Sequence, residues 1–292
     1  MFSIFTDTSA NLDCRLLQER QIRVIPFTFT VDGVEQTCTD TVAFDGKAYY
    51  DAIRNGAKVR TSQVTPQTYI DAMTPLLSAG QDVLFVGMSS GISGSYASAQ
   101  TAAAQLCEEF PERKICLVDT LGASLGEGLL VLDAADCRDS GMSIEDTTAL
   151  LDEKRHRMAQ VFTVEDLKHL RATGRLSNIA ALIGMVLQIK PLLKGDPEGK
   201  IVCFEKVRGR KRSIAAIAEQ YDKMVKDAPS QTVGIAHADC PEDAAMLEAL
   251  LKKNHPPKAI MNVCYEPMTG SHVGPGALAL FFFGVENVRS EL

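Results

Sequence analysis

The 292-residue sequence contains no tryptophan, and its eight cysteines are scattered singly with no Cys-x-x-Cys pair. This spacing provides no zinc-binding motif and no disulfide framework. We therefore interpret the cysteines as reduced core thiols and expect no metal ion. Hydrophobic residues nevertheless make up 46% of the chain, which is enough for a substantial aliphatic core.

Long apolar runs are also missing. No uninterrupted apolar stretch approaches the roughly 18 residues that a membrane-spanning helix requires. The chain begins with a strand-like segment at residues 2–5, where a signal peptide would have a basic region followed by an apolar core. We expect a cytoplasmic protein with no integral membrane segment.

Positive charge is in the minority, and the net charge is −7 at pH 7. Such a balance argues against a surface that coats nucleic acid. Residues 195–200 fall one residue short of a P-loop, and the glycines at positions 122, 126 and 128 do not fit G-x-G-x-x-G. We expect no nucleic-acid partner and no cofactor.

Strands and helices alternate through the first half of the sequence. Residues 2–5, 22–31, 82–88 and 114–118 are predicted strands, and residues 12–20, 44–55, 66–78 and 96–106 are predicted helices. Thr65 precedes a proline at the first helical position, as an N-cap residue does. The alternation is typical of α/β proteins and predicts a Rossmann-like parallel sheet with helices on its faces.

The second half of the sequence has a different pattern of predicted strands and helices. Strands are expected over residues 161–164, 190–194, 200–207, 232–237, 260–265 and 278–283, with helices over 165–172, 179–187, 213–225 and 241–253. A turn signal at residues 196–199 predicts an antiparallel hairpin. We predict an N-terminal α/β domain over residues 1–157, which carries hydroxyl-rich loops, and a C-terminal mixed α+β domain over residues 158–292.

A serine- and glycine-rich loop at residues 88–95 follows a predicted buried strand and precedes an alanine-rich helix. Glycine lets a backbone approach a ligand closely, and free N–H groups and hydroxyls favour an anion. Ligands of open α/β sheets bind at this end of the strands. Ser93, Gly94 and Ser95 are therefore candidates for anion binding, and a plain loop with a helix cap is the alternative.

Two further hydroxyl-rich connections precede helices. Thr61 and Ser62 lie just before the predicted cap Thr65, and Ser124 ends the connection after the strand at residues 114–118. We expect all three connections to open at the same sheet edge.

The loop at residues 88–95 also contains the pattern G-x-S-x-G, which makes Ser89 a candidate hydrolase nucleophile with a later Asp and His272. A nucleophile elbow passes straight into its helix, whereas residues 91–94 intervene here. No His-Gly-Gly oxyanion segment precedes the loop. The serine-hydrolase hypothesis is kept as an alternative.

Two basic segments stand out in this acidic chain, residues 174–177 with Arg175 and residues 206–212 with Arg208. They form either a solvated face or a docking site for phosphate or an acidic partner, since arginine binds phosphate oxygens in pairs. His272 is predicted to lie in a loop rich in glycine and proline, which either leaves the histidine simply exposed or holds it in a set position.

Taken together, six motifs in this order resemble those of the DegV family over nearly the whole chain. They are Thr6-Asp7-Thr8-Ser9, Arg60-Thr61-Ser62-Gln63, Ser89-Ser90-Gly91-Ile92-Ser93-Gly94-Ser95, Gly174-Arg175-Leu176-Ser177, Lys206-Val207-Arg208-Gly209 and His272-Val273-Gly274-Pro275-Gly276. The family includes the fatty-acid-binding subunit of bacterial fatty acid kinase.

The resemblance implies two α/β domains, with a long-chain fatty acid in a tunnel and its carboxylate near the domain interface. Thr61 and Ser93 would hold the carboxylate. Arg175, Arg208 and His272 match positions associated with the head-group end and with the kinase catalytic subunit, which supplies ATP and the catalytic machinery. The chain itself would be a substrate-binding subunit with no enzymatic activity.

The sequence departs from the family pattern at three positions. Thr8 and Asn11 replace the usual serine and aspartate of the first motif, and Val64 stands where proline is common. None of these three changes removes a presumed head-group ligand. A regulatory module that binds another small anionic lipid is the remaining alternative.

Overall fold

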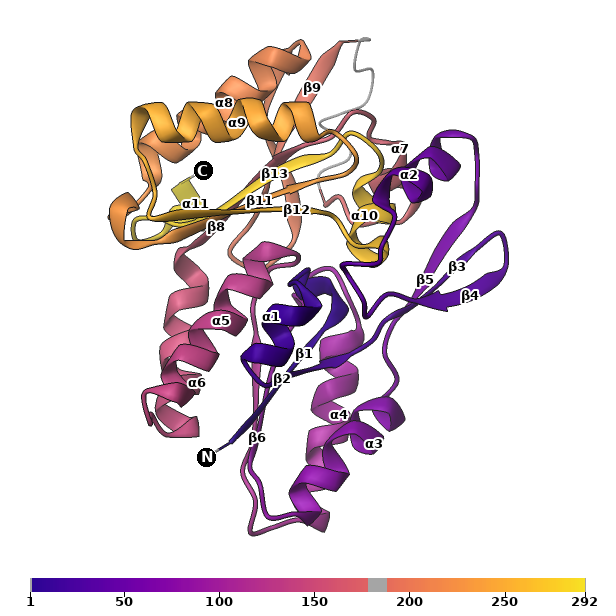
Figure 1. Cartoon of the computed structure of the whole chain (residues 1–292), viewed down its shortest axis with the longest axis vertical. Coiled ribbons are helices and arrows are strands. Elements are labelled where there is room, and N and C mark those ends of the chain that lie inside the picture. Colours follow the sequence, from indigo (N-terminus) through magenta and orange to yellow (C-terminus); the bar gives the residue numbers. More distant parts are fainter. Residues whose placement is uncertain (1, 178–187, 292) are drawn as a thin grey trace. The chain divides into compact units, whose positions relative to one another are not determined.

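The computed structural model describes residues 2–177 and 188–291 (Figure 1). The chain forms two compact units. Unit 1 comprises Met1–Phe44 and Lys58–Arg155, and unit 2 comprises Asp45–Ala57 and His156–Leu292. The helix predicted over residues 179–187 lies outside the described residues. The functional division at residue 157 stays a prediction.

Unit 1 is built on a four-stranded sheet whose neighbouring strands all pair in parallel, as predicted. The strands in spatial order are β2 (Ile22–Ile25), β1 (Ser3–Asp7), β6 (Val83–Gly87) and β7 (Ile115–Asp119). Every residue of β6 is buried, which is typical of a strand covered on both faces.

Helices cover both faces of this sheet, with α5 and α6 on one side and α3 and α4 on the other (Figure 1). The helices of unit 1 are α1 (Cys14–Glu19), α3 (Pro66–Ser78), α4 (Ser95–Glu109), α5 (Leu125–Asp139) and α6 (Ile144–Lys154), with a 3₁₀ turn η1 (Thr8–Ala10) after β1. The predicted cap of α3 is confirmed, because Thr65 Oγ1 accepts a hydrogen bond from the Thr68 N–H at 3.3 Å.

The single strand predicted over residues 22–31 is wrong. The chain breaks at Pro26 into β2 and β3 (Thr28–Val31), because proline has no N–H for a ladder hydrogen bond. β3 pairs antiparallel with β4 (Val34–Thr37) and with β5 (Val59–Ser62) in a separate three-stranded sheet.

Unit 2 contains a mixed six-stranded sheet. The spatial order is β10 (Ile201–Arg208), β9 (Ile189–Gly195), β8 (Met158–Thr163), β13 (Leu278–Phe283), β11 (Thr232–His237) and β12 (Ala259–Cys264). Among these described strands, β11 and β12 pair in parallel and the other neighbours pair antiparallel. The antiparallel pair β9 and β10 confirms the predicted hairpin.

The core of unit 2 lies between this sheet and the two long helices α8 and α9, which pack side by side (Figure 1). Tyr221 of α8 meets Phe282 of β13 edge to face, with ring centroids 5.1 Å apart. The described helices of unit 2 are α2 (Gly46–Arg54), α7 (Lys168–Ala172), α8 (Arg210–Met224), α9 (Pro241–Asn254), α10 (Pro267–Val273) and α11 (Val288–Glu291), with a 3₁₀ turn η4 (Ala228–Ser230). A further 3₁₀ turn, η2 (Arg155–Arg157), spans the boundary between the two units in the sequence. Over the described parts of the chain, no helix is both long and apolar enough to span a bilayer.

Candidate functional site

The parallel sheet of unit 1 has a topological switch point between β1 and β6. The chain runs outward from β1 to β2 on one side and from β6 to β7 on the other. Ligands of open α/β sheets bind beyond the carboxyl ends of the strands at such a point. Asp7 ends β1, and the N–H of Met88, directly after β6, donates to Asp7 Oδ2 at 3.2 Å. The predicted serine loop therefore begins at the switch point.

The loop at residues 88–95 is held by its own hydroxyls and backbone. The Ser93 N–H donates to the Ser89 carbonyl at 3.1 Å, and the Ser95 N–H donates to Ser93 Oγ at 3.2 Å. Ser93 Oγ in turn donates to Ser95 Oγ at 3.1 Å. Both serines are buried, with 8% and 1% of their surface exposed. Ser93 thus presents its oxygen from a fixed position at the start of α4.

The segment with Thr61 and Ser62 lies near this loop, but it belongs to a different sheet from the one predicted. Both residues lie in β5, and that strand belongs to the antiparallel sheet, so the expected shared sheet edge is wrong for this segment. The segment nevertheless meets the loop, because the Val64 N–H donates to Ser95 Oγ at 3.0 Å. A Cβ on Gly94 would lie 2.3 Å from Gln63 Oε1, so only glycine fits there without a shift.

Val64 is one of the departures from the family pattern. Proline has no N–H and could not make the hydrogen bond to Ser95. Of the other departures, Thr8 Oγ1 accepts a hydrogen bond from the Phe27 N–H at 3.1 Å. Val64 therefore stabilises the Ser95 hydroxyl through its backbone N–H, and Thr8 stabilises the backbone at Phe27 through its hydroxyl.

The third hydroxyl-rich connection follows β7 and lies at the same edge as the loop after β6. Asp119 Oδ1 accepts hydrogen bonds from the N–H groups of Ser90, at 3.2 Å, and Leu121, at 3.0 Å. Ser124 is fully buried, has a φ of 53°, and donates its hydroxyl to Asn11 Oδ1 at 3.2 Å. The structure thus places Ser124 against Asn11, and its role toward a ligand stays a prediction.

A pair of buried carboxyl groups underlies this edge of the sheet. Ser9 Oγ lies 2.5 Å from Asp7 Oδ1 and 2.5 Å from Glu127 Oε2, and Thr6 Oγ1 donates to Glu127 Oε1 at 2.9 Å. The Ser9 hydroxyl has one proton and can donate to only one carboxyl group. The second short contact therefore requires a proton on a carboxyl group.

Burial raises the pKa of Asp7, and hydrogen bonds from Ser9 and Met88 oppose the rise. Burial, followed by the neighbouring charge of Asp7, raises the pKa of Glu127 well above its usual value. Two carboxylates that contact the same buried hydroxyl cannot both be charged without a large cost. We assign the shared proton to Glu127, which leaves Asp7 as the anion that holds the Met88 N–H.

Sequence reasoning missed Glu127. Its signal is an acidic residue in the first turn of α5 inside an apolar run, Leu125-Gly126-Glu127-Gly128-Leu129. A charged residue there is usually exposed, whereas this side chain is completely buried. The carboxyl pair was beyond prediction because its two members are 120 residues apart and meet only in the folded sheet.

The loop predicted around His272 is wrong, because the residue lies on helix α10 of unit 2, which begins at Pro267 with Glu266 as its cap. Burial, and then the positive charge of nearby Arg175, lowers the pKa of His272 to about 4. The imidazole is therefore neutral at pH 7 and can accept as well as donate a hydrogen bond. The structure brings together these two of the three residues predicted to face the phosphate or the partner.

Arg208 is placed differently. Leu176, next to Arg175, bridges to Ile201 at the start of β10, and Arg208 is exposed at the end of that strand. Ile201 and Arg208 are seven positions apart on this strand, which corresponds to roughly 20 Å. Arg208 therefore lies far along β10 from the bridge next to Arg175. Farther along the same basic run, Arg210 and Arg212 form ion pairs with Asp243 and Glu219, which reduces the positive charge.

The geometry around Ser89 favours a structural role. Ser89 is fully buried, and its Oγ accepts a hydrogen bond from the Gly91 N–H at 3.1 Å. The five histidines of the chain all belong to unit 2, so unit 1 supplies no imidazole as a general base.

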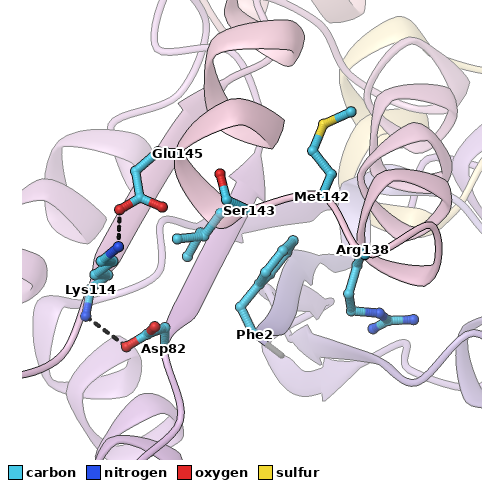
Figure 2. A pocket seen from close by; sticks show the side chains of 9 residues that line it. Phe2, Asp82, Lys114, Arg138, Met142, Ser143 and Glu145 are labelled. Carbon is cyan, nitrogen blue, oxygen red and sulfur yellow. Dashed lines mark hydrogen bonds and ion pairs between the residues drawn. The ribbon is translucent and has the colours of Figure 1, made fainter.

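A pocket of about 360 Å³ lies at the other end of the same sheet (Figure 2). Phe2, Asp82 and Lys114, which directly precede β1, β6 and β7, line it. Lys114 donates its N–H to Asp82 Oδ1 at 2.9 Å and forms an ion pair with Glu145 (Figure 2). The pocket is therefore distinct from the hydroxyl-rich edge.

Comparison with known proteins gives a consistent result. Residues 1–285 match the family model described as "Uncharacterised protein, DegV family COG1307". A DegV domain-containing protein from Clostridium perfringens is 35% identical over 283 residues, which cover 97% of each chain.

Two solved structures are similar over almost their whole length. A protein from Thermus thermophilus, described under "Fatty Acid Binding of a DegV family Protein", is 26% identical with a TM-score of 0.87, covering 97% of this chain and 99% of that one. A "fatty acid binding DegV family protein" from Streptococcus agalactiae is 30% identical with a TM-score of 0.84, covering 96% and 98%.

Proposed function

Because this chain belongs to the DegV family, we propose that it binds a long-chain fatty acid and presents the carboxylate to a separate fatty acid kinase in the cytoplasm. In this proposal the kinase supplies ATP and the catalytic groups, and this chain supplies the bound substrate. The observation that carries the proposal is the meeting of the Ser93 loop and the Thr61 segment at the switch point of unit 1, joined by the hydrogen bond from Val64 to Ser95.

The chemistry of that edge suits a carboxylate. A buried carboxylate needs hydrogen-bond donors, and the hydroxyls of Thr61, Ser62, Ser93 and Ser95, together with the N–H of Gly94, are the donors that we assign to it. A hydroxyl has one proton, so in this proposal the Ser93 hydroxyl turns from Ser95 Oγ to the carboxylate when the ligand binds. The acyl chain supplies most of the affinity. At ~0.8 kcal/mol for each buried methylene, about 15 methylenes contribute roughly 10 kcal/mol before ordering costs.

We assign Arg175, Arg208 and His272 of unit 2 to the reaction with the kinase. Phosphorylation adds negative charge to the carboxyl group, and arginine binds phosphate oxygens well. His272 and Arg175 lie close enough for the arginine charge to lower the pKa of the imidazole. A neutral His272 can donate one hydrogen bond to an acyl phosphate while Arg175 supplies the charge. Arg208, farther along β10, is assigned to kinase docking.

Native mass spectrometry of the freshly purified chain tests lipid binding. We expect a co-purified acyl chain, identified after extraction, and a thermal shift on addition of a long-chain fatty acid to the delipidated protein. An empty protein with no thermal shift would contradict the proposal. A bound lipid without a carboxylate would instead support a module for another anionic lipid.

Addition of ATP and a fatty acid kinase catalytic subunit tests whether the chain presents its bound fatty acid for phosphorylation. The expected product is an acyl phosphate. The hydrolase alternative predicts a different result, namely labelling of Ser89 by a fluorophosphonate probe and ester cleavage that Ser89→Ala abolishes. We expect neither.

A further inference from the structure

Helix α2 is encoded in the first half of the sequence but packs within unit 2. Its Tyr50 is completely buried and donates its hydroxyl to the Tyr265 carbonyl at 2.9 Å. The preceding Tyr49 donates its hydroxyl to the Pro267 carbonyl at 3.1 Å. Two adjacent tyrosines of α2 therefore bind the backbone at the start of α10, the helix that carries His272.

Helix α10 has only seven residues, too few to be stable without outside support. Glu266 caps its start, accepting hydrogen bonds from the N–H groups of Met268, at 2.5 Å, and Thr269, at 2.6 Å. At its end, a Cβ on Gly274 would lie 2.2 Å from His169 Cδ2, so α7 packs directly against the backbone there. The two ends of α10 are thus fixed by unit 2.

The middle of α10 is fixed by Tyr50. A Cβ on Gly270 would lie 1.8 Å from Tyr50 Oη and 2.9 Å from Tyr50 Cζ. The tyrosine hydroxyl therefore occupies the space that any side chain at position 270 would fill. His272 follows two residues later, so a rotation or shift of α10 at Gly270 moves the imidazole as well.

We propose that Tyr50 is a positioning residue for His272, acting through the contact of its hydroxyl with Gly270, and this inference rests on the role proposed above for His272. Tyr50 does not touch the substrate in this proposal. It sets the rotation of α10, and thereby keeps the imidazole beside Arg175 in a partly buried environment.

A double-mutant cycle tests this contact. Gly270→Ala inserts a methyl group against the Tyr50 hydroxyl and should displace α10. Tyr50→Phe removes the hydroxyl, the nearest clashing atom, and leaves only the ring carbon at 2.9 Å, so the double variant should return α10 toward its native position. Tyr49→Phe is the matched control, because it also removes a hydroxyl bound to the backbone of α10 but not the one that faces Gly270.

The readout is the titration of His272 in the full chain, followed by NMR of the imidazole and assigned with His272→Gln. The native value of about 4 depends on burial and on Arg175. We expect Gly270→Ala to raise it by about one pH unit or more, toward the value of a solvated histidine. Gly270→Ala with Tyr50→Phe should reverse at least half of that rise, and Gly270→Ala with Tyr49→Phe should not reverse it.

An unchanged titration in folded Gly270→Ala, or equal rescue by both phenylalanine variants, would overturn the proposal. If Gly270→Ala does not fold, the two double variants decide, since only the one with Tyr50→Phe should fold and titrate close to the native value. Fatty-acid affinity is measured in parallel. If the unaltered chain binds no fatty acid, the proposed function is refuted. The contact between Tyr50 and α10 is still tested, because the titration cycle does not depend on lipid binding.

Discussion

The backbone N–H of Val64 donates a hydrogen bond to Ser95 Oγ over 3.0 Å. This contact joins the end of an antiparallel strand to the first turn of α4, two elements that sequence order keeps about 30 residues apart. Ser95 Oγ also accepts from Ser93 Oγ. The backbone at position 64 therefore acts on the position of Ser93 through one intervening hydroxyl.

Val64→Pro should weaken fatty-acid binding. Proline removes the N–H, and an unmet hydrogen bond of this kind costs about 1 kcal/mol, or about fivefold in affinity. Val64→Ala is the control, since it keeps the N–H while it shortens the buried side chain. Isothermal titration with a long-chain fatty acid measures both. Equal affinities for the two variants would show that the hydrogen bond does not position Ser93.

Ser93→Ala should weaken fatty-acid binding by about three- to tenfold, because it removes a buried hydroxyl assigned to the carboxylate. Ser90→Ala in the same loop is the control. Ser90 is exposed, and its N–H, which the substitution retains, binds Asp119. A loss of affinity as large in Ser90→Ala as in Ser93→Ala would contradict the assignment of the carboxylate to Ser93.

Arg208→Ala should leave fatty-acid affinity within about twofold and reduce the rate of acyl phosphate formation by the kinase. The reason is its exposed place at the end of β10, where we assign it to docking. Arg212→Ala is the control, because Arg212 belongs to the same basic run but forms an ion pair with Glu219. Lipid binding lost in Arg208→Ala to the same extent as in Ser93→Ala would refute this division of roles.

Glu127→Gln should flatten the pH dependence of stability. The folded-state pKa of Glu127 is raised above its unfolded value of about 4.5, so its stabilising contribution is full below that value and is lost as pH rises through the folded pKa. The slope reaches about 1.4 kcal/mol per pH unit within that window. Glutamine mimics the protonated acid and does not titrate. Urea unfolding between pH 5 and pH 9 measures the difference.

The control for that experiment is Glu145→Gln. A hydrogen bond from Lys114 lowers the pKa of Glu145, so its contribution is present at high pH and lost as pH falls, the opposite direction. Glu145 is exposed, and its effect should be small. A wild-type stability that does not fall with rising pH would contradict a shared proton on Glu127.

The parallel sheet and the serine loop could be predicted because they depend on local patterns. An apolar run such as Val83–Gly87 is typical of a covered strand, and Thr65 with Pro66 marks a helix start. Pro26 is a local signal in the sequence that the predicted strand over residues 22–31 divides into two. Its consequence, a second sheet that carries Thr61, depends on the pairing of β3 with β5 and has no local signal.

The same distinction applies to the site. Ser93 and His272 are predicted from short motifs, and their roles toward a ligand stay predictions, whereas no motif points to Glu127 or Tyr50. Glu127 is ordinary until Asp7 and Ser9 surround it, and Tyr50 lies on an amphipathic helix that reads like any other. Their importance arises from contacts with residues 118 and 215 positions away.

The passage of Asp45–Ala57 into the second unit makes that unit discontinuous along the chain. During synthesis from the N-terminus, Tyr50 leaves the ribosome long before Tyr265, whose carbonyl lies 215 positions later. Its final partner is absent for most of translation, and closing so long a loop is slow. A fragment that begins after Arg155 would lack α2 entirely, so the two halves cannot be separated by one cut without removing a buried tyrosine from the second.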